Sequence, residues 1–269
     1  MALVVCPTPI GNLEDVTLRS LRELGAADVV LCEDTRRTRT LLARHGVRAR
    51  LLSYHAHNEA QRVEEVLPGL VAGERVAIAS DAGLPALNDP GARLIAAAIA
   101  EGVQVVVLPG PSAIETALVA SGLVGERYSF LGYLPRRALD RDRLWEELGA
   151  WSWPAVAFES PRRLPTSLAS LARREPGRPL AVCRELTKVH EEIVRGSAGE
   201  LASRFAEPPK GEVTLVIGPA QEAGVAVAQG EALAAVAELL AAGVPRRRAV
   251  DLVARLTGVS RNSLYRESL

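Results

Sequence analysis

The amino-acid sequence predicts an α/β protein made of two α/β domains and a small helical module at the C-terminus. Short apolar runs alternate along the chain with longer segments of helical period, which is typical of strands alternating with helices. Hydrophobic residues make up 48% of the chain but aromatic residues only 4%, a composition that suits parallel sheets covered by helices. A chain of 269 residues also exceeds one core of ordinary size, which favours two domains and a small appendix.

The first domain is expected over residues 1–111. Its apolar runs predict strands at 3–6, 29–32, 51–53, 76–79 and 103–108. The segments of helical period between them predict helices at 17–24, 35–45, 58–72 and 90–101. Because parallel strands are joined by helical crossovers, this repeat predicts a parallel, doubly wound sheet.

The second domain is expected over residues 112–220. Its predicted strands are 128–133, 155–158, 180–183, 192–195 and 213–217. The shorter spacing between these strands favours a mixed sheet. A stretch rich in Gly, Ala and Gln at 218–230 is expected to be a linker, and the module over 225–269 follows with helices predicted at 231–242, 246–256 and 261–267.

Several strand-to-helix junctions carry the residues that usually begin helices. Asp34 precedes the segment at 35–45, and Asp89 and Ser160 each precede a proline, so all three are predicted as N-caps. Ser112 with Glu115 predicts a capping box, and Asn58 precedes its helix with Gln61 in the similar position. Capping alone is therefore an alternative to a functional role at each junction.

The 32 basic and 32 acidic residues cancel, so the overall charge gives no reason to expect binding to nucleic acid or to a membrane. Only two of the basic residues are lysines, Lys188 and Lys210, in a chain that otherwise uses arginine. A compact ammonium could be required at these two positions, with chance as the alternative.

Cys6, Cys32 and Cys183 lie in apolar runs without the spacing of metal ligands, so buried free thiols and no metal site are expected. No apolar run approaches the roughly 18 residues that span a bilayer. The sequence therefore predicts a cytoplasmic protein.

Polar clusters follow each predicted strand of the first domain, at the edge where open α/β sheets bind ligands. These clusters occupy residues 6–15, 33–36, 54–59, 80–83 and 109–113. Neither GxGxxG nor GxxxxGK[ST] is present, and stiff turns such as Pro109-Gly110-Pro111 replace a phosphate-binding loop. The residues alone thus predict a crevice for a neutral or cationic small molecule.

An ordered series of longer motifs runs through the chain. It consists of PTPIGNLEDVT (7–17), EDTR (33–36), SYHAHNE (53–59), SDAGLPALNDPG (80–91), LPGPSAIETAL (108–118), GYLPR (132–136), ESPRRL (159–164), CRELTKVHEE (183–192) and KGEVTLVIG (210–218). The series resembles the ribosomal RNA small subunit methyltransferase I family, the 16S rRNA cytidine 2′-O-methyltransferases of the tetrapyrrole methylase superfamily, whose members are class III methyltransferases. The resemblance covers essentially the whole sequence.

The resemblance implies two α/β domains with S-adenosylmethionine in the cleft between them, usually in a homodimer, and 16S rRNA or the small ribosomal subunit as partner. It also implies which residues contact the cofactor. These are Pro7, Asp81, Ala82, Gly83, Leu84, Ser112, Ala113, Phe158, Leu186 and Thr214.

The implied reaction is attack of a ribose 2′-oxygen on a sulfonium methyl group, which a proton acceptor would assist. The candidates for this role are Glu33, Asp34, His57, Glu59 and Glu191. We expect Glu33, Asp34, Arg36 and Glu59 to form the substrate side of the cleft, and we add Lys188 as a further catalytic candidate. Helix capping and packing at the sheet edge are the alternatives for these side chains.

The tail at 242–265 looks like a helix-turn-helix module whose turn contains Gly258. Its candidate RNA-binding residues are Arg246, Arg247, Arg248 and Arg261, with a solvated surface on a small three-helix cap as the alternative. Two other functions compete with rRNA methylation. One is a small-molecule methyltransferase acting on a tetrapyrrole, and the other is an RNA-binding assembly protein without turnover.

Overall fold

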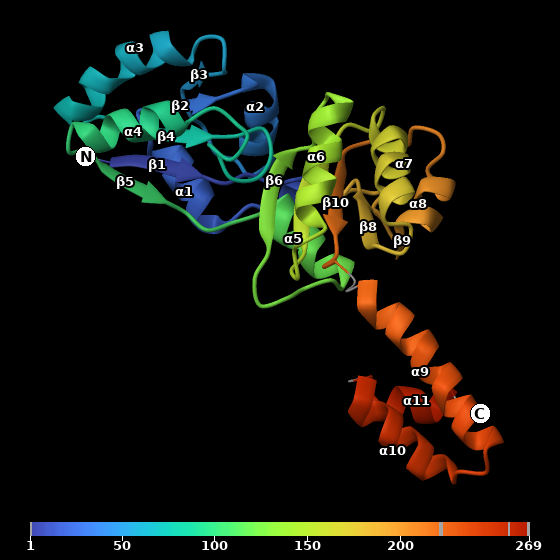
Figure 1. The fold of residues 1–269 in the computed structure, drawn as a ribbon. Coiled ribbons are helices and arrows are strands. Elements are labelled where there is room, and N and C mark those ends of the chain that lie inside the picture. The colour runs from blue at the N-terminus through green and yellow to red at the C-terminus, as the bar shows by residue number, and fades with distance from the viewer. Residues whose placement is uncertain (1, 221–222, 258, 268–269) are drawn as a thin grey trace. The chain divides into compact units, whose positions relative to one another are not determined.

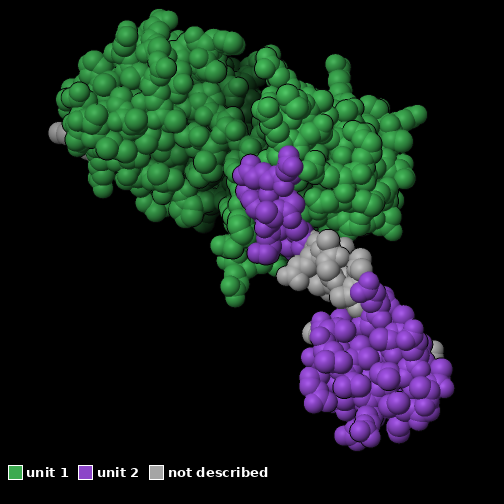
Figure 2. Space-filling view, viewed as in Figure 1, with its two compact units in different colours: residues 1–145, 153–218 green, residues 146–152, 219–269 purple. Residues whose placement is uncertain are grey.

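The computed structural model describes residues 2–220, 223–257 and 259–267 (Figure 1). The chain divides into two compact units, which Figure 2 shows in different colours. The first comprises Met1–Trp145 and Trp153–Gly218, and the second comprises Glu146–Ser152 and Pro219–Leu269. The first unit contains both sheets, and the second contains the C-terminal helices.

The first sheet is parallel throughout, with strand order β3-β2-β4-β1-β5. Its strands are β1 (Ala2–Cys6), β2 (Val29–Cys32), β3 (Leu51–Ser53), β4 (Arg75–Ala79) and β5 (Gln104–Val107). The five predicted strands are thus confirmed with small shifts at their ends, as is the parallel sheet. Strands β1 and β4, far apart in sequence, lie side by side at its centre.

Helices cover both faces of this sheet, which explains why its strands are apolar on both sides. The helices of this half are α1 (Leu18–Ala26), α2 (Thr35–Arg44), α3 (Glu59–Ala72) and α4 (Ala92–Ala100), with a short 3-10 helix η1 (Leu13–Asp15) before them. Leu3 and Val5 pack in one core cluster with residues of α3 and α4. Val4 and Cys6 face the opposite side, in a cluster with residues of α1 and α2.

The second sheet is mixed, as the spacing of its strands predicted. Its strands are β6 (Ser129–Tyr133), β7 (Ala155–Glu159), β8 (Pro179–Arg184), β9 (Glu192–Ser197) and β10 (Val213–Ile217). They lie in the order β6-β7-β10-β8-β9, in which only β6 and β7 are parallel neighbours. The accompanying helices are α5 (Ala113–Ser121), α6 (Ala138–Leu148), α7 (Leu164–Arg174) and α8 (Ala198–Arg204).

The predicted helix caps are confirmed only in part. The Asp34 carboxylate accepts a hydrogen bond from the Arg36 backbone N–H at 2.8 Å and begins α2 as expected. Asp89 and Ser160, however, are not caps, because α4 begins after Gly91 and α7 after Arg163. The backbone first turns through left-handed positions at Ala86 and Asn88, which delays the start of α4 and leaves Asp89 free for another role.

The two remaining caps also differ from the prediction. The Ser112 hydroxyl at the start of α5 bonds the Glu115 side chain rather than the helix backbone. The Asn58 side chain accepts from the His55 N–H at 2.8 Å and donates to the Ser53 carbonyl at 3.1 Å. Asn58 therefore closes the turn after β3 instead of capping α3.

The second unit contains α9 (Ala223–Ala241), α10 (Arg246–Thr257) and α11 (Arg261–Glu267). Val236, Val250 and Leu264 from these helices meet in one small apolar core. The predicted linker at 218–230 is wrong in its second half, because α9 already begins at Ala223 in this alanine-rich sequence. The predicted turn at Gly258 lies outside the described residues.

The three cysteines, Cys6, Cys32 and Cys183, are free and buried, as expected. Burial raises the pKa of the Cys6 thiol to about 12, so this side chain stays protonated and unreactive. Among the helices described, none combines the length and the apolar character needed to cross a membrane.

Candidate active site

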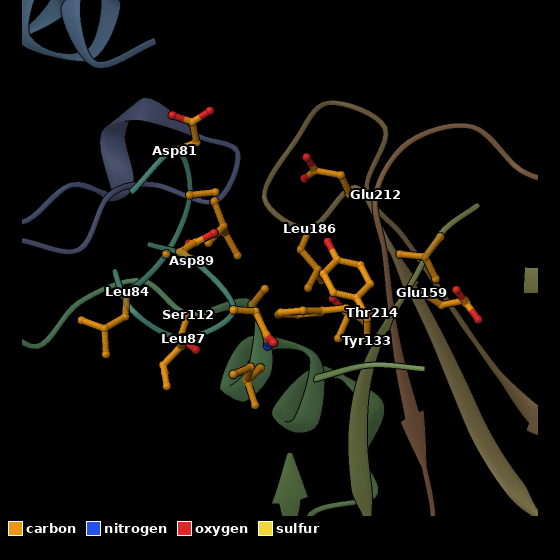
Figure 3. A pocket seen from close by; sticks show the side chains of 18 of the residues that line it. Asp81, Leu84, Leu87, Asp89, Ser112, Tyr133, Glu159, Leu186, Glu212 and Thr214 are labelled. Atoms are coloured by element: carbon orange, nitrogen blue, oxygen red, sulfur yellow. The ribbon is translucent and has the colours of Figure 1, made fainter. Parts of the chain in front are cut away.

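A cavity of about 510 Å³ opens between the loops that follow the strands of the first sheet and one end of the second, mixed sheet, both within the first unit. The segments that follow the strands of the first sheet, including the first turns of α2 and α5, contribute Ile10, Glu33, Arg37, Asp81, Ala82, Gly83, Leu84, Leu87, Asn88, Asp89, Ser112, Ala113 and Ile114. From the second sheet it is lined by Tyr133, Phe158, Glu159, Ser160, Pro161, Cys183, Leu186, Glu212, Val213 and Thr214. Figure 3 shows Asp81 and Asp89 on one side, with Tyr133, Leu186, Glu212 and Thr214 facing them from the other.

Hydrogen bonds between the loops after β1 and β4 shape the floor of the first half. The Thr8 N–H donates to the Gly83 carbonyl and the Gly83 N–H to the Thr8 carbonyl, both at 2.9 Å. The hydroxyl of Ser80 also donates to the Gly83 carbonyl, at 2.8 Å. Gly83 has φ +78°, a conformation that a side chain would strain, so glycine permits this tight crossing.

The residues expected to contact a cofactor all line this cavity except Pro7. The Pro7 ring instead packs against Gly110, where a Cβ atom would collide with the Pro7 ring. Pro7 thereby supports the loop that leads into Ser112 and Ala113. The structure thus brings together positions that are more than 130 residues apart in the sequence, such as Gly83 and Thr214.

Of the residues expected on the substrate side, Glu33 lines the cavity, whereas Asp34 and Arg36 pair with each other. The Arg36 guanidinium donates to the two Asp34 carboxylate oxygens at 3.0 and 2.7 Å. This contact holds the pKa of the Asp34 carboxyl well below its ordinary value, so Asp34 is a weak proton acceptor. The Asp34 backbone N–H donates to the Asp81 carboxylate at 2.9 Å and so helps to hold Asp81 in place.

Glu59 lies behind the cavity lining rather than in it. Its carboxylate accepts hydrogen bonds from the Tyr54 hydroxyl at 2.8 Å and from the Gly91 N–H at 3.0 Å. Gly91 ends the loop that carries Asp89. Glu59 therefore fastens this loop to α3 and is not among the residues that line the cavity.

Lys188 also lies outside the lining, in the loop between β8 and β9. Its ammonium donates to Glu185 and to the lining residue Glu212, both at 2.9 Å. Partial burial opposes the charge, but the hydrogen bonds to Glu185 and Glu212 outweigh it and raise the pKa of Lys188. The lysine thus joins two carboxylates at the rim of the cavity.

Replacing Lys188 with Met should therefore weaken cofactor binding without stopping the reaction. Loss of two charge-assisted hydrogen bonds releases Glu212, and we expect the KM for the cofactor to rise about tenfold while kcat changes little. Steady-state kinetics would measure both constants, with Lys210→Met as the matched control. A large fall in kcat with unchanged KM would instead make Lys188 a catalytic residue.

Several lining residues were missed by sequence reasoning. Asp89 was interpreted as a helix cap because a proline follows it. Tyr133 and Glu159 occur in the motifs GYLPR and ESPRRL, but only the pairing of β6 with β7 shows that both strand ends reach the cavity. Arg37 gave no signal beyond its place in an arginine-rich helix.

The charges of the lining favour a cationic ligand. Carboxylates outnumber guanidinium groups among the described lining residues, and Arg37 already lies 3.5 Å from the Asp81 carboxylate. An excess of acidic groups attracts a cation and repels phosphate. Burial raises the pKa of the lining residue Cys183 to about 11, so this thiol is neutral and unsuited to nucleophilic attack.

Apolar side chains form the other part of the wall. Leu84, Leu87, Ile114 and Leu186 line the cavity beside Phe158. The Phe158 ring contacts Tyr133 edge-to-face, with centroids 5.5 Å apart. The cavity thus suits a ligand that combines a flat apolar ring with a positive charge.

Two family models match this chain, one over most of the residues that contain the two sheets and one over the C-terminal helices. Residues 2–202 match the family described as Tetrapyrrole (Corrin/Porphyrin) Methylases. Residues 226–269 match the domain described as the RsmI C-terminal HTH domain.

Three similar proteins carry the name Ribosomal RNA small subunit methyltransferase I. The relative from Mesorhizobium japonicum is 43% identical over 100% of this chain and 91% of its own. The relative from Mycobacterium tuberculosis is 43% identical over 98% of this chain and 93% of its own. The relative from Thermotoga maritima is 42% identical, but its match covers 80% of this chain and 97% of its own.

Solved structures share the fold at lower identity. Uroporphyrin-III-C-methyltransferase from Thermus thermophilus has a TM-score of 0.55 at 21% identity, covering 81% of this chain and 94% of that chain. Diphthine synthase has a TM-score of 0.63 at 12% identity, covering 81% of this chain and 90% of that chain.

Proposed function

This chain belongs to the tetrapyrrole methylase family, and from that premise we propose that it transfers a methyl group from S-adenosylmethionine to a cytidine ribose 2′-oxygen in 16S rRNA. Relatives with 37–43% identity are named for small-subunit rRNA methylation, which supports this substrate over a tetrapyrrole. The structures of tetrapyrrole enzymes share only the fold. Since bacterial rRNA is made and modified in the cytoplasm, the proposed reaction takes place there.

The observation that carries the proposal is the mixed character of the cavity wall. S-adenosylmethionine combines an adenine ring with a sulfonium and an ammonium cation, and supplies an electrophilic methyl group when bound. Apolar residues such as Leu84 and Leu186 fit the ring, and the carboxylates of Asp81 and Glu212 fit the positive charge. Backbone groups at Gly83 and Ala113 would complete the contacts.

The chain contributes to methyl transfer mainly by alignment and by excluding water. The paired loops at Thr8 and Gly83 hold one wall, and the ion pairs of Lys188 hold the rim opposite it. A rigid frame of this kind orders the reacting groups before the reaction begins. The alignment of the reacting groups is lost when either loop moves.

The arginines of the second unit differ in their availability to RNA. Arg246 stacks on the Tyr265 ring at 4.4 Å and donates to the Tyr265 carbonyl, and Arg261 pairs with Asp251. Arg247 and Arg248 are exposed and have no partner within the part of the chain that the structure describes. These two side chains are therefore the better candidates for RNA phosphate contacts.

Replacing Arg247 and Arg248 with Ser should weaken RNA binding and leave cofactor binding unchanged. Two lost phosphate contacts should lower the slope of log K against log salt by about 2. Filter binding to small-subunit RNA over a salt series would measure this slope, with Arg48→Ser and Arg50→Ser as a control of equal charge. An unchanged slope would contradict a role of these two arginines in RNA binding.

A homodimer is part of the proposal. Val107, Val119 and Val124 expose large apolar side chains on the first unit, the kind of side chain that a second copy would cover. Analytical ultracentrifugation would determine the oligomeric state.

The decisive experiment is transfer of labelled methyl from S-adenosylmethionine to small subunits that lack this modification, followed by nuclease mapping. Label at one cytidine 2′-oxygen would establish the reaction and its substrate. Measurable cofactor binding without any label on RNA would discard the rRNA substrate and favour a small-molecule methyltransferase.

A further inference from the structure

The loop between β4 and α4 places one carboxylate, Asp89, in the cavity by an unusual backbone path. Ala86 and Asn88 adopt φ values of +72° and +60°, in a region that side chains ordinarily avoid. Conformations of this kind persist where the surrounding structure enforces them, and they concentrate at functional sites. Figure 3 shows Asp89 directed toward the interior of the cavity, below Asp81.

Contacts at three points hold this loop. Thr8 binds Gly83 near its start, and Glu59 accepts the Gly91 N–H at its end. Between them, the Asn88 side chain packs closely over Gly132, where the pairing of β6 with β7 shifts its register. This last contact joins the loop to the second sheet, immediately beside Tyr133.

Asp89 differs from most of the neighbouring carboxylates because its oxygens are free, a property that it shares among the described lining residues with Glu33. Several of the neighbours are held in ion pairs: Asp34 by Arg36, Asp81 by Arg37, Glu159 by Arg163 and Glu212 by Lys188. The Glu59 carboxylate accepts hydrogen bonds from Tyr54 and Gly91. Among the described residues, no donor bonds the Asp89 carboxylate.

The groups around Asp89 make it more basic than an ordinary aspartate. Desolvation, followed by the negative charges of Glu33 and Asp81, raises its pKa to about 6. Arg37 offsets part of the Asp81 charge, and Tyr133 faces Asp89 from the second sheet. A half-buried carboxylate that titrates near pH 6 is suited to accept a proton at neutral pH.

We propose that Asp89 accepts the proton of the ribose 2′-hydroxyl during methyl transfer, an inference that rests on the function proposed above. The hydroxyl oxygen forms a bond to the methyl carbon while the carbon–sulfur bond breaks and its electron pair remains on sulfur. The hydroxyl proton moves to an Asp89 carboxylate oxygen, which becomes a neutral carboxylic acid. Solvent then takes up that proton and restores the carboxylate.

The test is the Asp89→Asn variant of the full-length protein, assayed on small subunits that lack the modification. We expect kcat to fall about 10²- to 10⁴-fold, the usual contribution of a general base. In the wild-type protein, kcat/KM should rise about tenfold per pH unit below pH 6 and level off above it. The variant should lose this dependence, and Asp89→Glu should regain part of the rate.

Two measurements independent of turnover accompany this test. Calorimetric binding of S-adenosylmethionine should stay within about threefold of wild type, because Asp89 is assigned to the ribose and not to the cofactor. The melting temperature at pH 8 should rise in Asp89→Asn. The folded protein keeps the Asp89 proton up to about pH 6 while the unfolded chain releases it near 3.8, so the charged carboxylate destabilises the fold above that window.

The outcomes separate this assignment from the proposed function itself. Asp140→Asn, an exposed aspartate outside the cavity lining, is the matched control and should behave like wild type. If wild type methylates RNA and Asp89→Asn retains its kcat or its pH dependence, the assignment is wrong, and Glu33→Gln would then be tested for the same loss. If the variant loses cofactor binding, Asp89 is a binding residue and the assignment is equally overturned. Absence of RNA methylation by wild type would contradict the proposed function.

Discussion

Replacing Glu159 with Ala is expected to lower the free energy of unfolding by about 3–5 kcal/mol, the usual cost of removing one partner of a buried ion pair. The Glu159 side chain is completely buried and lies 2.6 Å from the Arg163 guanidinium. It also accepts hydrogen bonds from the Ser160 N–H and the Ser167 hydroxyl, both at 2.6 Å. Alanine would leave all three donors without their acceptor.

The loss should reach the cavity as well as the fold. Arg163 also donates to the Leu134 carbonyl at 3.1 Å, and thereby ties the end of β7 to the loop after β6. Urea denaturation would measure the free energy, and cofactor titration would measure the effect on the site. Glu14→Ala removes an exposed carboxylate 3.8 Å from Arg44, so this control should cost less than about 1 kcal/mol.

A double variant distinguishes loss of the ion pair from loss of side-chain volume. Replacing Glu159 with Leu and Arg163 with Met together removes both charges, and should be less destabilising than Glu159→Ala alone. Equal losses in the two variants would mean that packing, rather than the buried charge, stabilises this corner.

Adding a single methyl group at Gly11 should weaken cofactor binding by about 10- to 100-fold. An alanine Cβ atom there would lie 2.6 Å from the Leu186 carbonyl oxygen and 2.7 Å from the Thr187 hydroxyl. The Asn12 N–H also binds the Thr187 hydroxyl at 3.0 Å, so the two loops are already joined at this point. Overpacking of this kind typically costs 1–3 kcal/mol, and here it displaces Leu186 from the cavity wall.

Isothermal titration with S-adenosylmethionine would measure the effect of Gly11→Ala. Gly230→Ala is the matched control, since nothing lies within 4 Å of the added atom and alanine favours the helix. Unchanged affinity in Gly11→Ala would show that the two loops separate without disturbing the site.

The supporting residues show why part of the site was accessible to sequence reasoning and part was not. Local signals identified Asp34 as a helix cap, because capping depends on neighbours within the same turn. The same signals misassigned Asp89, since a following proline resembles a helix start whether or not the backbone turns there first. Glu59 and Lys188 were expected to take part in the reaction, but their partners come from distant segments.

The sequence by itself determined the alternation of strands and helices, the parallel and mixed sheets and the family of the protein. These follow from hydrophobic period and from motifs, which are properties of neighbouring residues. Only the tertiary structure decided which polar side chains face the cavity and which form ion pairs or hydrogen bonds with one another. The freedom of Asp89, the pairing of Lys188 with Glu212 and the contact of Gly11 with Leu186 all depend on segments that meet only when the two sheets fold together.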